Sequence, residues 1–245
     1  MKINKQLCIG CEACHPYCPV GAIYTVEIDG KCVSEVNKEE CVECGVCLRS
    51  GACPEEAIYM PKLDWPRSLR AEFSDPLVPH SSTKARGRGT QEMKTNDVTN
   101  RIRPGFTGVA VEMGRPGIGT KFRDIETACM ELAKVGIYLE PTNPTTTLIA
   151  DKARGKFIDE ILDEKVLSAI FEFTVENERL KEVLKVIQGI SSRIDSVFSL
   201  GLMSRVNEDG TIPIASIIEE AGFAARPNTK TCIGLGKTAT MKKEI

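Results

Sequence analysis

The sequence predicts an α+β protein in two parts: a small unit with internal pseudo-twofold symmetry, followed by a split βαβ α/β sandwich. Three observations predict this class. Nine of the eleven cysteines lie within the first 53 residues. A motif that runs from Cys8 to Tyr24 recurs from Cys41 to Tyr59, down to its final Ala-Ile-Tyr. From Gly105 onward, the segments follow the order strand, helix, strand, then strand, helix, strand.

The composition limits the classes of function. With 42% hydrophobic and 27% charged residues, the 245-residue chain has the make-up of a globular domain protein. Its formal net charge of -2 predicts no general affinity for nucleic acid or anionic membrane. No apolar run approaches the roughly 18 residues of a membrane span, and the N-terminus lacks the apolar region of a signal peptide. We therefore expect a cytoplasmic protein, in which crowded cysteines bind metal and do not form disulfides.

Three segments follow along the chain. Residues 1–62 form the cysteine-rich unit, in which Asp29-Gly30 predicts a tight hairpin turn between two short strands. Residues 63–104 have little apolar periodicity and many Pro, Ser, Thr, Asn and Arg residues, which indicates an extended linker lying over another surface. Residues 105–245 form the α+β sandwich, a candidate docking or ligand-binding domain.

The elements of this sandwich come from local periodicity. Strands are expected at 106–113, 137–141, 166–176 and 194–206, and helices at 122–136, 147–165, 177–193 and 212–222, before a polar tail. A split βαβ sandwich packs two helices on one face of a four-stranded antiparallel sheet. Amino-acid-binding ACT-type regulatory domains share this element order, although order alone does not establish function.

The cysteine repeats carry the strongest chemical signal. Each begins with C-x2-C-x2-C, which lets three thiolates of one short loop converge on a compact metal cluster. The fourth cysteine, Cys18 or Cys53, precedes a proline that fixes its own φ and turns the chain out of the loop. The fourth thiolate is thereby directed toward the other triplet.

The motif C-x2-C-x2-C-x3-C-P from Cys8 to Pro19 resembles that of the bacterial-type two-cluster ferredoxins. The resemblance covers residues 1–62 and implies a ferredoxin domain with two [4Fe-4S] clusters. The crossed pattern of that family implies Cys8, Cys11, Cys14 and Cys53 as ligands of one cluster, and Cys41, Cys44, Cys47 and Cys18 as ligands of the other.

One departure concerns Cys53. Five residues, LRSGA, separate it from Cys47, where the strict motif has three. Pro54 and the Ala-Ile-Tyr continuation still favour it as a ligand. The alternative for both repeats is a pair of zinc sites, but zinc sites commonly separate their C-x2-C units by a dozen or more residues, and a compact triplet ending in Cys-Pro favours iron–sulfur clusters.

Other candidate residues leave alternatives open. His15 either tunes the nearby cluster or is merely exposed, Cys32 is expected as a free thiol in the hairpin, and Cys129 falls on the apolar side of a helix. Cys232 lies in the polar tail between Lys230 and Lys237, where a lowered thiol pKa is conceivable.

GRPGIGTK (114–121) and GLGKT (234–238) both fail the phosphate-loop motif at essential positions, so tight turns are expected, with anion binding at the following helix as the alternative for 114–121. The linker arginines, Arg86, Arg88, Arg101 and Arg103, either dock an acidic partner or are solvated.

Three hypotheses for function remain. The favoured one is an electron-transfer protein or subunit that relays single low-potential electrons through two clusters to a partner oxidoreductase, because fully cysteine-ligated clusters leave no site for substrate. The second is a redox- and metabolite-sensing regulator with an ACT-like ligand-binding domain. The third, an enzyme with its active site in residues 105–245, lacks any visible metal set, flavin motif or acid–base group. The expected partner is a redox protein, with neither nucleic acid nor membrane, and a homo-oligomer through the C-terminal domain stays open.

Overall fold

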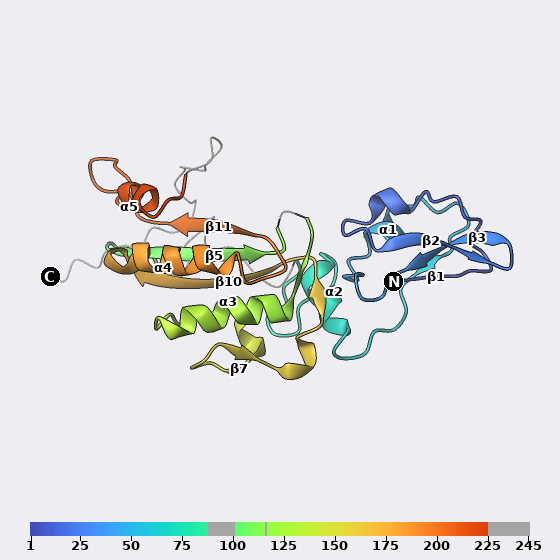
Figure 1. The fold of residues 1–245 in the computed structure, drawn as a ribbon, viewed down its shortest axis with the longest axis horizontal. Coiled ribbons are helices and arrows are strands. Elements are labelled where there is room, and N and C mark those ends of the chain that lie inside the picture. The colour runs from blue at the N-terminus through green and yellow to red at the C-terminus, as the bar shows by residue number, and fades with distance from the viewer. Residues whose placement is uncertain (88–100, 116, 225–245) are drawn as a thin grey trace.

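The protein folds into two lobes that lie end to end along its long axis (Figure 1). The computed structural model describes residues 1–87, 101–115 and 117–224. We refer to residues 1–62 as the N-terminal lobe and to residues 63–224, as far as they are described, as the C-terminal lobe. None of the helices in these ranges is long and apolar enough to cross a membrane.

The N-terminal lobe consists of two small antiparallel pairs of strands and two short helices. Strand β1 (Lys2–Ile3) pairs with β4 (Ile58–Tyr59), and β2 (Ile23–Ile28) pairs with β3 (Lys31–Val36). Asp29 and Gly30 between β2 and β3 both have positive φ, at 51° and 73°, so the predicted tight hairpin turn is present. The 3-10 helix η1 (His15–Tyr17) and the helix α1 (Val46–Arg49) occupy corresponding parts of the two repeats.

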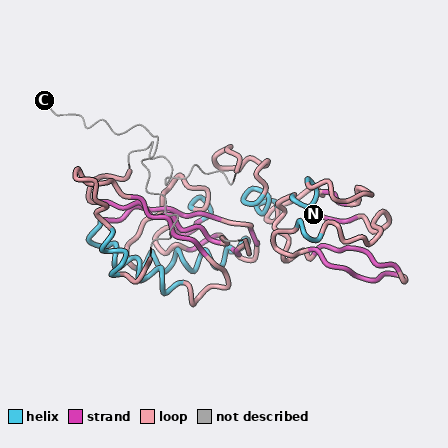
Figure 2. Tube along the Cα trace, turned by 90° about the horizontal axis from the view of Figure 1, so that it is seen from above, coloured by secondary structure: helices cyan, strands magenta, loops and turns pink. Residues whose placement is uncertain are grey.

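The C-terminal lobe is built on a three-stranded antiparallel sheet. Its order is β10 (Ala169–Glu176), β5 (Phe106–Met113) and β11 (Phe198–Met203), with Val111 of the central strand opposite Phe171 and Leu200. Strands β10 and β11 are parallel to each other and are joined by α4 (Asn177–Ile190), which makes a split βαβ unit around β5. Helices α3 (Phe122–Lys134) and α4 lie on the same side of the sheet (Figure 2). The expected strands at 106–113, 166–176 and 194–206 and the helices at 122–136, 177–193 and 212–222, the last as α5 (Ala215–Glu220), are present.

Two expectations for this lobe are wrong. The fourth strand expected at 137–141 is not formed; one backbone hydrogen bond, from Glu140 N–H to the Glu172 carbonyl at 2.7 Å, ties this segment to the edge of β10. Pro141 and Pro144 cannot donate to a strand ladder, and the chain instead turns into the 3-10 helix η2 (Thr146–Leu148).

The helices expected at 147–165 are also absent. That range contains the hairpin of β7 (Ile149–Asp151) and β8 (Lys156–Phe157), then the 3-10 helix η3 (Asp159–Ile161), and at its end β9 (Lys165–Val166), which pairs with β6 (Thr120–Lys121). Gly155, with a φ of 69°, makes the turn of the hairpin. Phe157 and Ile161 are buried as expected, so the apolar positions were identified correctly and the element type was not.

A helix interrupts the stretch expected to be an extended linker. Helix α2 (Ser68–Ser74) lies between the two lobes and buries Leu69 and Phe73 in the main core of the C-terminal lobe (Figure 1). The Phe73 ring packs edge-on against Phe122, with centroids 5.4 Å apart, and against His80 at 4.8 Å. At least this part of the stretch is therefore integral to the C-terminal core.

Candidate metal centre

Eight cysteines of the N-terminal lobe surround two separate hollows. Cys8, Cys11, Cys14 and Cys53 line the first hollow, with apolar residues such as Ile3 and Ala57 between them. The second hollow is lined by Cys18, Cys41, Cys44 and Cys47, with apolar neighbours that include Val20 and Val36. Each hollow thus combines three cysteines of one repeat with the fourth cysteine of the other.

The backbone follows the same course in both repeats. Gly10 and Glu12 have positive φ in the first loop, and the residues at the corresponding positions of the second loop, Glu43 and Gly45, have it too. Such left-handed residues fold a short loop so that its thiols turn inward. Gly10 also packs closely against the carbonyl of Cys32, where a Cβ would not fit.

The turn after each Cys-Pro pair is likewise repeated. The N–H of Ala22 donates to Cys18 Sγ at 3.1 Å, and the N–H of Ala57 donates to Cys53 Sγ at 3.3 Å. Cys53 therefore has the same local geometry as Cys18 despite the longer LRSGA spacer, which is accommodated by α1 and a left-handed Gly51. Hydrogen bonds of this kind to sulfur stabilise a thiolate and tune a bound cluster.

Burial shields most of these thiols from water. Cys41, Cys44 and Cys47 are each 7% exposed, whereas Cys11 of the first hollow is exposed. Burial raises the pKa of the Cys14 and Cys44 thiols and raises that of Cys47 to about 12. Without metal these groups are neutral thiols, so metal binding has to displace their protons.

The arrangement fits a polynuclear cluster better than a single metal ion. No group of three or more His, Cys, Asp or Glu side chains in the described ranges is placed to hold one ion. A zinc ion needs its four ligands at about 2.0–2.3 Å from one point. Four thiols spaced around a hollow, as found here twice, instead suit a cluster whose own iron and sulfur atoms fill the centre.

Two further residues of this lobe were singled out from the sequence. His15 Nε2 lies 3.0 Å from Ser34 Oγ, which in turn lies 4.0 Å from Cys14 Sγ, so His15 is connected to the first hollow through one hydroxyl. Cys32 is exposed on β3 and lines neither hollow.

The candidates of the second half have structural surroundings where they are described. Cys129 is buried in the core of the C-terminal lobe, where burial raises its pKa, and it is not a nucleophile poised for reaction. The N–H of Gly119 donates to the Gly114 carbonyl at 3.3 Å, and Thr120–Lys121 form β6 directly before α3, whereas residue 116 of this segment lies outside the described residues. Arg101 forms an ion pair with Glu140 at 2.6 Å, whereas Arg86 and Arg103 are exposed. Arg88, Lys230, Cys232, Lys237 and residues 234–238 lie outside the described residues.

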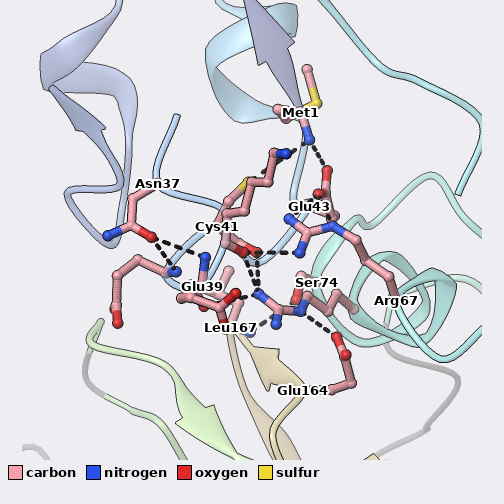
Figure 3. A network of polar contacts seen from close by, with 12 residues as sticks. Met1, Asn37, Glu39, Cys41, Glu43, Arg67, Ser74, Glu164 and Leu167 are labelled. Atoms are coloured by element: carbon pink, nitrogen blue, oxygen red, sulfur yellow. Dashed lines mark hydrogen bonds and ion pairs between the residues drawn. The ribbon is translucent and has the colours of Figure 1, made fainter. Parts of the chain in front are cut away.

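Sequence reasoning missed a polar network that joins the second hollow to the C-terminal lobe (Figure 3). Arg70 of α2 is 2% exposed, and its Nη1 donates to the carbonyls of Lys38, Glu39 and Cys41 at 3.0, 2.9 and 2.8 Å. Its Nε pairs with Glu164.

Further cations extend this network. Arg67 Nε donates to Glu43 Oε1 at 2.8 Å, and Lys165 pairs with Glu40, whose pKa is lowered chiefly by that hydrogen bond. Arg49 donates to the Cys44 carbonyl at 2.6 Å and to Asp75 at 2.7 Å. Most of the partners are far apart in the sequence, so no local pattern indicated the network.

The N-terminal lobe thus carries a ferredoxin-type iron–sulfur segment. Residues 1–24 match the family model of the 4Fe-4S binding domain, which supports at least one [4Fe-4S] cluster and iron–sulfur electron transfer.

A curated relative agrees with this class. A segment of 53 residues is 41% identical to part of one subunit of an ion-translocating oxidoreductase complex from Methanosarcina acetivorans. This similarity covers 22% of the present chain and 18% of that protein. No solved structure matches the chain.

Proposed function

We propose that the protein relays single low-potential electrons through two [4Fe-4S] clusters to a partner oxidoreductase. Cys8, Cys11, Cys14 and Cys53 would hold the first cluster, and Cys41, Cys44, Cys47 and Cys18 the second. The observation that carries this proposal is the gathering of eight thiols into two sets of four with the same loop backbone in both repeats.

The chain's own residues support the cluster in three ways. When bound, a [4Fe-4S] cluster supplies a carrier that gains or loses one electron. Apolar side chains such as Ile3 and Val36 keep water from the hollows, and the N–H groups of Ala22, Ala57 and Ser34 donate to cysteine sulfurs at 3.1–3.3 Å. All four cysteines of a hollow would be occupied as ligands, which favours electron transfer over substrate binding.

The crossed arrangement also supports a short relay. Cys18 and Cys53 each follow the loop of one hollow and line the other, and residues of both hollows, such as Cys14 and Cys47, pack in one hydrophobic cluster. A cluster in one would therefore lie next to a cluster in the other. Electrons could pass between them without a further carrier.

The proposed partner is a redox enzyme. The curated relative is named as a subunit of an oxidoreductase complex, and we extend this role to the present chain. Residues 1–62 would be the electron-carrying domain. The C-terminal lobe would dock the protein to the enzyme. By our proposal, this lobe includes α2, which lies in the stretch expected to be a linker.

Metal analysis of the anaerobically reconstituted full chain tests the two-cluster proposal. We expect about eight iron and eight sulfide per chain. Cys47→Ser, in the second hollow, should lower the iron content to about half, and Cys32→Ser, a free thiol in the same lobe, should leave it unchanged. About four iron in the unmodified chain, or the same loss with Cys32→Ser, would refute it.

An anaerobic pull-down from native extract tests the partner. An oxidoreductase that co-purifies and accepts electrons from the dithionite-reduced chain supports the proposed role. Capture of proteins that are not reduced by the chain would contradict it.

A second function, the metabolite sensor with an ACT-like domain, is favoured by one observation. Directly after the segment where the fourth strand was expected, the loop at 141–147 buries Asn143, Thr145 and Thr146, and Asn143 donates to Glu172 at 3.1 Å. Thr146 Oγ1 is buried without a hydrogen-bond partner among the described residues. A thermal-shift screen of the full chain with the twenty amino acids tests this function, and no shift at millimolar ligand would argue against it.

A further inference from the structure

Among the described residues, the C-terminal lobe makes its polar contacts beside only one of the two hollows, the second. Apart from Lys62 and Asp64 at the boundary itself, every hydrogen bond and ion pair between the described parts of the lobes uses residues 38–49, which begin just before the second repeat and extend into it. Gly119 of the C-terminal lobe also approaches this side, since a Cβ on it would lie 3.7 Å from Val20 Cγ1, and Val20 lines the second hollow. The second hollow is therefore the one nearer the C-terminal lobe. We call it the inner hollow and the first hollow the outer one.

Two arginines hold the loop that carries its cysteines. Arg70 donates to the carbonyl of Cys41 at 2.8 Å, and Arg49 donates to that of Cys44 at 2.6 Å. Each guanidinium group thus binds the backbone carbonyl of a cysteine whose own thiol lines the second hollow. Arg70 is 2% exposed, whereas Arg49 is 34% exposed and its partner Asp75 4%, so solvent screens the charge of Arg70 weakly and that of Arg49 in part.

The first hollow has different electrostatic surroundings: its carboxylates are exposed and line it, whereas Glu43, the buried carboxylate of the second loop, is paired with the Met1 ammonium and Arg67. Two carboxylates, Glu12 and Glu55, are among its lining residues, whereas no charged side chain of the described residues lines the second hollow. Cys11 of the first hollow is exposed. The two repeats therefore place similar thiols in different fields.

These fields act on a cluster in a known direction. Reduction adds negative charge, so a nearby cation raises the reduction potential and a carboxylate lowers it. Burial alone works against the second hollow, because it disfavours the added charge. The arginine donors oppose that effect at the second hollow, and the carboxylates Glu12 and Glu55 lower the potential at the first.

We propose that Arg49 and Arg70 are positioning residues that raise the reduction potential of the inner cluster above that of the outer one. An electron that enters at the exposed Cys11 side then settles on the cluster beside the C-terminal lobe. This inference rests on the proposed function, in which each hollow holds a [4Fe-4S] cluster. It adds a direction to the relay, toward the lobe that contributes Arg70.

The test is a redox titration of the reconstituted full chain, followed by the electron paramagnetic resonance of the reduced clusters. Two one-electron waves are expected for the unmodified protein. Arg49→Gln should lower the midpoint potential of the higher-potential wave by at least about 59 mV, which is a tenfold change of the one-electron equilibrium toward the oxidised form. Arg49→Lys, which keeps the charge, should shift it less than half as far in millivolts.

A reciprocal variant identifies the waves. Glu12→Gln removes a carboxylate from the rim of the first hollow, while its amide oxygen can still accept the hydrogen bond from Thr25. We expect it to raise the midpoint potential of the lower-potential wave by at least about 18 mV, which is a twofold change of the one-electron equilibrium. The potential of the higher wave should not change. Arg123→Gln, at an exposed ion pair with Asp163 in the C-terminal lobe, is the charge control and should move neither wave.

Each outcome decides the inference. If Arg49→Gln leaves both waves unmoved, moves the lower one, or acts no more strongly than Arg123→Gln, the inference is overturned. It is also overturned if Glu12→Gln raises the upper wave. Iron analysis of the same samples separates the two proposals: about eight iron with unmoved waves refutes the arginine role alone, and about four refutes the two-cluster function itself.

Discussion

Truncating Phe73 to alanine tests whether α2 belongs to the C-terminal core. The Phe73 side chain is 1% exposed and packs edge-on against Phe122 and His80. Burying a phenylalanine contributes about 1.5–3 kcal/mol through transfer from water, and the cavity left by truncation adds to the loss. We therefore expect Phe73→Ala to lower the free energy of unfolding by about 3–5 kcal/mol.

The assay is urea unfolding of the full chain, followed by far-ultraviolet circular dichroism, a signal to which α3 and α4 contribute strongly because they are the longest described helices. For a slope of about 2 kcal/mol per molar urea, the midpoint should fall by roughly 1.5–2.5 M. Tyr138→Ala is the matched control, because it removes an aromatic ring that is 80% exposed and should cost less than about 0.5 kcal/mol. If Phe73→Ala costs no more than Tyr138→Ala, α2 lies on the core without supporting it, and the linker interpretation is restored.

Three further predictions address particular residues. Gly155→Ala should destabilise by about 2 kcal/mol or more, since the new Cβ would lie 2.6 Å from the Cys129 carbonyl at a φ of 69°, whereas Gly136→Ala, with a similar φ of 73° and open space, should cost about half as much in the same urea assay. Alkylation followed by peptide mapping should modify exposed Cys32 in the native protein and leave Cys129 unmodified until the chain unfolds, because burial raises the pKa of Cys129 and blocks access; equal rates would contradict the buried placement. Burial lowers the pKa of His80, so the unfolded chain binds more protons below the unfolded pKa of about 6.5, and stability should fall as the pH drops through that value; His80→Asn should remove that part of the slope, and an unchanged slope would exclude His80 as its source.

The sequence was most informative where the signal is local. The long periodic segments, such as 106–113 and 177–193, become β5 and α4 because each fits one period over several turns or pleats. The motif spacing also indicated the eight cysteines that line the two hollows. In contrast, the range 147–165 has few residues per element, and its apolar positions suit a short hairpin as well as a helix.

The interface between the lobes could not be predicted in the same way. Arg49 meets Asp75 across 26 residues and Lys165 meets Glu40 across 125, so the contacts depend on how two folded lobes dock. In the sequence, Arg67 and Arg70 lie in a stretch that reads as a polar linker. The burial of Arg70, which is 2% exposed, is a property of the assembled protein that no local window of sequence contains.

The internal repeat nevertheless holds one clue to that interface. Aligned from their first cysteines, Glu43 of the second repeat corresponds to Gly10 of the first, and Arg49 corresponds to Pro16. Glu43 and Arg49 are two of the side chains that contact the C-terminal lobe. Gly10 and Glu43 both have positive φ, at 71° and 57°, so the shared backbone does not account for the glutamate, and its surroundings do. In this chain, the two charged residues that stand in the second copy where the first has Gly10 and Pro16 therefore mark the second hollow as the side where the second lobe attaches.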